Sequence, residues 1–170
     1  MNELLYTEGV NRGIREPGLI ELLQRGGIYQ DIPGTSPQEV LTHTIQTITL
    51  PASITPEDLL QAVLEREALM STAVGNGIAL PHPRNPLISG LEEQCVIIGF
   101  LRQPVDWKAL DGQKVHTLLL IVSSSAKSHL HTLSRLSFFC QQEAFRSHLR
   151  NRASLEHIIK TIQAIEQTWN

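Results

Sequence analysis

Two apolar runs near the middle of the chain restrict the fold more than any other feature of the sequence. The runs are Cys95–Leu101 and Val115–Ser123, both rich in the β-branched and aliphatic residues that are typical of buried strands. Asp111-Gly112 between them is a turn signal. Because segments of helical periodicity occur before and after these runs, we expect an α/β layered domain with helices on both faces of a mixed sheet.

Capping signals mark the starts of several predicted helices. Ser36 can cap a helix whose first position is Pro37, and Glu39 completes a capping box. The segment Thr55-Pro56-Glu57-Asp58 repeats this signal. Helices are predicted at residues 19–26, 36–48, 55–69, 130–140, 145–149 and 154–165, and short extended runs at 28–32 and 78–80.

The composition suits one packed domain, because 41% of the 170 residues are hydrophobic and 18% are charged. We expect this domain at residues 28–170, after an N-terminal extension, residues 1–27, with a short helix.

Lysines and arginines are scattered, so we expect no nucleic-acid partner. The central apolar run Leu118–Val122 is too short to span a bilayer, and the first twenty residues lack a secretion signal. We therefore expect a cytoplasmic protein without direct membrane insertion.

The segment from Arg66 to Arg84 carries the candidate chemistry. His82 follows a short apolar strand and stands between two prolines, which fix the local backbone. A neutral imidazole nitrogen is a nucleophile that can accept a phosphoryl group at neutral pH. Glycines in the same segment permit close backbone approach, and successive amides there can form an anion-binding nest. The predicted phosphoryl-binding loop consists of Ser71, Thr72, Gly75, Asn76 and Gly77. These residues alone leave open that His82 is a structural loop histidine.

The run STAVGNGIALPHPR, residues 71–84, resembles the active-site motif of the fructose/mannitol-type enzyme IIA domains of the bacterial phosphotransferase system. This family includes the nitrogen-regulatory IIA proteins. An Arg-Glu pair precedes the motif here as in the family, and the resemblance extends over roughly residues 28–169. It implies a three-layer α/β/α sandwich with a central mixed sheet of about five strands. One departure is Ala73, where the family usually has glycine; a positive φ there would strain alanine.

The resemblance also implies roles for individual residues. The phosphorylated histidine of the family falls on His82, and its second active-site histidine falls on His129. The arginine of the Arg-Glu pair falls on Arg66, whose guanidinium can offer paired donors to phosphate oxygens. A metal site formed by His129 and His131 is disfavoured, because the side chains of residues two apart on a helix point about 200° apart. No metal and no cofactor are expected.

The implied function is that of a phosphocarrier, an enzyme component that accepts a phosphoryl group on His82 and passes it on. The implied donor is a histidine-containing phosphocarrier protein, and the acceptor is an enzyme IIB domain or a regulatory target protein. The alternative is a nitrogen-type regulatory module that acts by phosphorylation-dependent protein binding. A metal hydrolase is a further alternative, but the carboxylates of Asp106 and Asp111 lack a partner base. The sequence does not identify a sugar.

Overall fold

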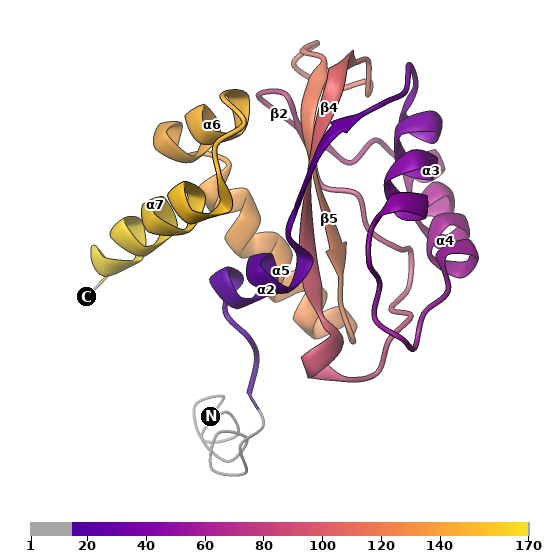
Figure 1. Cartoon of the computed structure of the whole chain (residues 1–170), viewed down its shortest axis with the longest axis horizontal. Helices are drawn as coiled ribbons and strands as arrows, with labels where there is room; N and C mark the ends of the chain where they lie inside the picture. Colours follow the sequence, from indigo (N-terminus) through magenta and orange to yellow (C-terminus); the bar gives the residue numbers. More distant parts are fainter. Residues whose placement is uncertain (1–14, 170) are drawn as a thin grey trace.

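The computed structural model describes residues 15–169, which form a three-layer α/β/α sandwich (Figure 1). The central sheet has the strand order β1-β4-β5-β3-β2. The pairs β1–β4 and β3–β5 are parallel, whereas β4–β5 and β2–β3 are antiparallel. This confirms the predicted mixed sheet of five strands. The strands are β1 (Ile28–Ile32), β2 (Ala73–Gly75), β3 (Ile78–Ala79), β4 (Cys95–Val105) and β5 (Val115–Val122).

Helices cover both faces of the sheet. In Figure 1, α3 and α4 lie on one side of the strands, and α2, α5, α6 and α7 lie on the other. The bounds are α2 (Leu19–Gly26), α3 (Pro37–Thr47), α4 (Pro56–Leu69), α5 (Ala126–Phe139), α6 (Glu143–Arg150) and α7 (Leu155–Gln167), with a short 3-10 turn at Leu91–Glu93. Within residues 15–169, the helices are too short or too polar for any of them to cross a membrane.

The central strands are apolar over Cys95–Leu101 in β4 and Leu118–Val122 in β5, because both faces of these segments are buried. In β5, Leu118 and Leu120 pack on the side of α3 and α4, whereas Leu119 and Ile121 pack on the side of the other helices. Alternate side chains of a strand point to opposite faces, so β4 and β5 feed two separate hydrophobic cores. The predicted apolar runs thus form the middle of the sandwich.

The predicted helix caps are present. The Ser36 hydroxyl accepts the Glu39 amide at 3.2 Å, and the Thr55 hydroxyl accepts the Asp58 amide at 3.2 Å. The Glu39 carboxylate differs from the expected capping box, because it accepts the amide and hydroxyl of Thr35 rather than the amide of Ser36. The cap residue is the same, but the reciprocal bond falls one residue earlier.

Strand β4 is longer than predicted, and β2 was not predicted. The side chains of residues 102–104 are exposed, and the β4–β5 register shifts between Phe100 and Val105. The apolar pattern therefore ends at Leu101 although the strand continues. Strand β2 has only three residues, and none of them is fully buried, so it carries no periodicity to detect.

Helix α2 packs directly against β4. A Cβ atom on Gly26 would lie 1.9 Å from the carbonyl oxygen of Val96, so only glycine permits this approach. The next residue bonds to the same strand, since the Ile98 amide donates to the Gly27 carbonyl at 3.0 Å. Leu19, Leu22 and Leu23 of α2 belong to the same hydrophobic core as Leu136 of α5 and Ile158 of α7. The division of the chain at residue 27 stays a prediction; residues 1–14 lie outside the described part.

We expect Gly26→Ala to lower the free energy of unfolding by about 2–3 kcal/mol, the range for overpacking a tight contact, because the clash is with backbone. Gly18→Ala is the matched control, since a Cβ there meets nothing within 4 Å. Urea unfolding of both variants measures the difference. Equal stability of the two variants would show that α2 does not lie as closely on β4 as described.

Candidate active site

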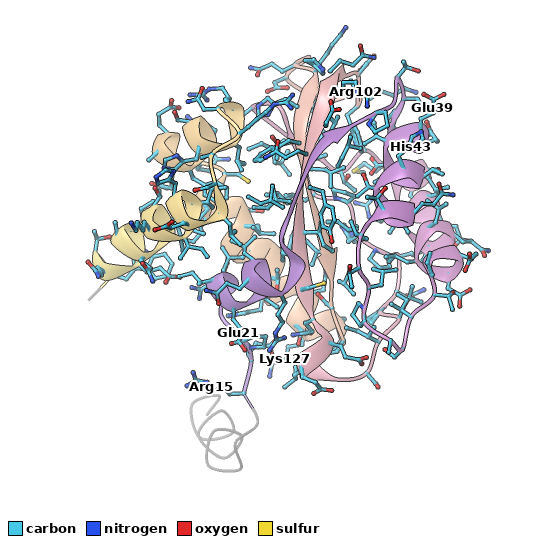
Figure 2. The ribbon with its side chains drawn as sticks, viewed as in Figure 1. Arg15, Glu21, Glu39, His43, Arg102 and Lys127 are labelled. Atoms are coloured by element: carbon cyan, nitrogen blue, oxygen red, sulfur yellow. The ribbon has the colours of Figure 1, made fainter. Side chains whose placement is uncertain are left out.

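His82 lies just beyond the sheet, where the parallel strands β3 and β5 end. The Ile121 amide of β5 donates to the Pro81 carbonyl at 2.9 Å, and Ser123 follows the end of β5. Ligand sites commonly form at the carboxyl ends of parallel strands, because loops diverge there. Figure 2 marks this end of the molecule by Lys127, in the first turn of α5, and the opposite end by Arg102.

The protonation of the His82 ring follows from its hydrogen bond. Its Nδ1 lies 2.9 Å from the carbonyl oxygen of Leu80. A carbonyl can only accept, so Nδ1 carries the hydrogen and Nε2 carries the free lone pair. The backbone that positions the ring is itself bonded, because the Leu80 amide donates to the Thr72 carbonyl at 2.9 Å. His82 therefore offers Nε2 as a nucleophile from a fixed ring.

His129 comes to the same place from the start of helix α5. The Ser125 hydroxyl caps this helix by accepting the Ser128 amide at 3.1 Å. Residues three apart share a helix face, so Ala126 and His129 both line the same cavity. The rings of His82 and His129 lie 4.3 Å apart between centroids, tilted by 43°. His131 is exposed and is not among the residues that line the cavity.

The surroundings of both site histidines favour the neutral form. Burial lowers the pKa of His82, and the Arg66 charge adds to this, whereas the Leu80 hydrogen bond and Glu67 act in the opposite direction. Burial lowers the pKa of His129 to about 4, with smaller contributions from His82 and Arg66. Neutral His82 is a nucleophile, and neutral His129 retains one N–H that can donate to a phosphoryl oxygen.

We expect acidification to destabilise the protein through His129. Its pKa is about 4 when folded and 6.5 ordinarily, so between these values the unfolded chain binds a proton that the folded chain excludes. The free energy of unfolding must therefore fall as the pH drops from 6.5 to 4. His129→Asn cannot titrate, so its pH dependence should be shallower, by up to about one proton. Denaturant unfolding at several pH values compares the two slopes; identical slopes would contradict the burial of His129.

Arg66 supplies a positive charge beside the two rings. It lies in the last turn of α4, and its Nη1 donates to the Met70 carbonyl at 2.6 Å, which orients the guanidinium. The cavity that it lines with His82 and His129 measures about 220 Å³. A cavity needs only about 10–15 Å³ of such volume to hold one water, so a phosphoryl group fits. The remaining lining residues are Pro83, Arg84, Asn85, Pro86, Ile121, Ser123, Ala126 and Leu130, none of them acidic.

Three of the predicted loop residues lie at the other end of the β2–β3 pair. The Gly77 carbonyl bonds to the amides of His116 and Thr117, whereas the Pro81 carbonyl bonds to Ile121. Four to five residues of strand separate these points, which is about 13–17 Å at ~3.3 Å per residue. Gly75, Asn76 and Gly77 therefore do not line the His82 cavity. They form a tight hairpin turn with φ values of 90°, 57° and 79°.

The central amide of this hairpin, that of Asn76, already has a partner. The Asp111 carboxylate accepts the Asn76 amide at 2.9 Å, so a side chain of the same protein takes the donor at the centre of the predicted anion-binding nest. Asn-Gly between two short strands is a strong hairpin signal. That signal in the sequence identifies the turn, whereas its glycine content alone suggested phosphate binding.

The other predicted loop residues brace the site rather than line it. The Ser71 hydroxyl donates to the Trp107 carbonyl at 2.5 Å and accepts the Ala73 amide at 3.1 Å. Thr72 is buried and is hydrogen-bonded to Glu67. Ala73 lies in β2 opposite Ala79 and is not among the residues with positive φ, so alanine is unstrained there.

Arg84, Asn85 and Ser123 also line the cavity, although the sequence did not point to them. Arg84 and Asn85 follow His82 closely, and sequence proximity alone could have suggested them. Ser123 could have been found from its place after β5, because β3 and β5 are parallel and end together. With Arg84, the cavity contains two arginines and no lining carboxylate, which suits an anionic ligand.

Comparison with known proteins identifies the protein family of the chain. Residues 21–165 match the family model for the phosphoenolpyruvate-dependent sugar phosphotransferase system, EIIA 2. The chain belongs to this family, whose members act as phosphotransfer components, and the predicted resemblance is confirmed.

Individual relatives come from two branches. A nitrogen regulatory protein of Pseudomonas aeruginosa is 32% identical over 154 residues, which covers 87% of this chain and 96% of the relative. The fructose-specific EIIABC component of Bacillus subtilis is 28% identical over 147 residues, 85% of this chain but only 23% of that relative. The crystal structure of nitrogen regulatory protein IIA-Ntr from Neisseria meningitidis has a TM-score of 0.66 at 25% identity, covering 82% of this chain and 91% of that one.

Proposed function

We propose that the protein is a phosphocarrier that takes a phosphoryl group onto Nε2 of His82 and then passes it to a second protein. The observation that carries this proposal is the fixed His82 ring, with Nδ1 bonded to Leu80 and Nε2 free in a cavity that Arg66 and His129 also line. The donor is a histidine-containing phosphocarrier protein. The acceptor is an enzyme IIB domain, and both encounters take place in the cytoplasm.

The proposed step needs no metal or cofactor. The lone pair of His82 Nε2 attacks the phosphorus, and the donor's N–P bond breaks as the new one forms. The electron pair of the broken bond returns to the donor's imidazole nitrogen. Arg66 and the N–H of His129 compensate the charge on the equatorial oxygens, as positioned donors do in phosphoryl transfer. The second transfer reverses these events toward the acceptor's nucleophile.

An apolar surface next to the cavity supports docking of protein partners. Leu130 lines the cavity and is 65% exposed, and Leu69 and Met70, which follow Arg66 in the chain, are 61% and 71% exposed. Exposed apolar side chains of this size commonly mark contact surfaces. We propose that donor and acceptor both contact these side chains.

The test is incubation with a purified donor system and labelled phosphoenolpyruvate. The proposal requires label that is stable in base and labile in acid, as phosphohistidine is. A wild-type protein that takes up no such label would overturn the proposed function.

A regulatory role is a second candidate, because the nitrogen regulatory relative is the more similar of the two relatives and is matched over 96% of its length. In that case the phosphorylated protein would retain its label in the presence of fructose- and mannitol-type IIB domains. Rapid transfer to either IIB domain would favour transport instead.

A further inference from the structure

Glu67 lies outside the cavity beside His82, yet its carboxylate is hydrogen-bonded to the segment of chain that holds His82 in place. It lies in the last turn of α4, next to Arg66, but it is not among the cavity-lining residues. Its carboxylate accepts the Thr72 amide at 2.8 Å through one oxygen and the Thr72 hydroxyl at 2.6 Å through the other. Two bonds to one carboxylate fix both the position and the rotation of Thr72.

Thr72 passes this restraint to the nucleophile. Its carbonyl accepts the Leu80 amide at 2.9 Å, and the Leu80 carbonyl accepts Nδ1 of His82 at 2.9 Å. Thr72 is 5% exposed and Leu80 is 1% exposed, so water does not compete for these bonds. A continuous set of hydrogen bonds thus runs from the end of α4 to the ring that accepts the phosphoryl group.

We propose that Glu67 is a positioning residue, which holds His82 in the Nδ1–H form with Nε2 free for the phosphoryl group by anchoring Thr72 and Leu80. This rests on the proposed function of His82. The carboxylate also opposes the neighbouring Arg66, because the two charges act on the His82 ring in opposite directions. The two neighbouring residues therefore have different roles: Arg66 faces the cavity, and Glu67 holds the nucleophile in position.

The primary test is Glu67→Gln, read out by NMR of the unphosphorylated protein. The two Thr72 donors bond to different carboxylate oxygens, and glutamine replaces one of these oxygens with an NH₂ group that cannot accept. We expect the ¹⁵N shifts of the His82 ring to move toward a mixture of tautomers and the pKa of His82 to fall below the wild-type value. The phosphorylation rate should fall on the order of tenfold, as expected for a displaced nucleophile. The matched control is Glu65→Gln, the same change on the exposed face of the same helix.

Thr72→Val provides a second variant that leaves all charges in place. It removes one bond to Glu67 but keeps the Thr72 amide and carbonyl. The His82 tautomer should shift in the same direction as in Glu67→Gln, with a smaller loss of rate. This variant replaces Glu67→Gln if the latter does not fold.

The outcomes separate this proposal from the proposed function. Ring shifts and rates in both variants equal to those of Glu65→Gln would overturn the positioning role. A wild-type protein that takes up no phosphate would overturn the phosphocarrier role, but the tautomer of His82 would still report on Glu67. A change in thermal stability without a change in the ring shifts would show a merely structural role and would also overturn the proposal.

Discussion

His82→Gln is expected to abolish phosphorylation altogether. A glutamine amide has no nucleophilic nitrogen, so neither Arg66 nor His129 can compensate for its loss. The fold should persist, because His82 is only half-buried and its one hydrogen bond, to the Leu80 carbonyl, can be replaced by the glutamine amide. Labelling with the donor system measures the effect, and thermal unfolding verifies the fold.

His131→Gln is the matched control for this experiment. His131 is exposed on α5 and does not line the cavity, so its replacement should leave labelling at the wild-type level. Base-stable label on the His82→Gln protein equal to that of wild type would place the acceptor elsewhere and refute the site.

His129→Ala should slow phosphorylation by about 10²-fold, the usual effect of removing one preorganised donor to a transferring group. The final extent of labelling should not change, because Nε2 of His82 is intact. The loss should fall on kcat rather than on KM for the donor protein, since docking depends on exposed apolar residues such as Leu130. Stopped-flow or rapid-quench kinetics at several donor concentrations separate the two parameters.

His131→Ala again provides the comparison, because it removes the same side chain from the outward face of the same helix. Unchanged rates in His129→Ala would remove His129 from the site. A raised KM with unchanged kcat would instead assign His129 to partner binding.

Most of the fold follows from local patterns in the sequence. The apolar runs correspond to β4 and β5, and Ser36 and Thr55 cap the helices that they were expected to begin. The pairing order of the strands required the structure, because no local pattern specifies that β3 lies between β5 and β2. That order decides which loops meet.

The site shows the same division between local and distant information. The resemblance pointed to His82, His129 and Arg66, which the structure brings to one cavity. The glycines at 75 and 77 were expected beside them because they are close in sequence. The short strand β3 places the glycine turn at one end and His82 at the other, and composition does not show at which end of a strand a loop lies. The sequence assigned no role to Glu67, because its hydrogen bonds to Thr72 follow from no spacing rule.

In the proposed phosphoryl transfer, the bond from His82 Nδ1 to the Leu80 carbonyl would make the encounters with donor and acceptor mutually exclusive. A ring that is tied at one nitrogen cannot rotate to present its load on another side. The proposed donor and acceptor would therefore use the same opening, and one would leave before the other binds. The protein would then have one binding site that both partners use in turn. Its kinetics would be ping-pong, with no ternary complex of the protein and both partners.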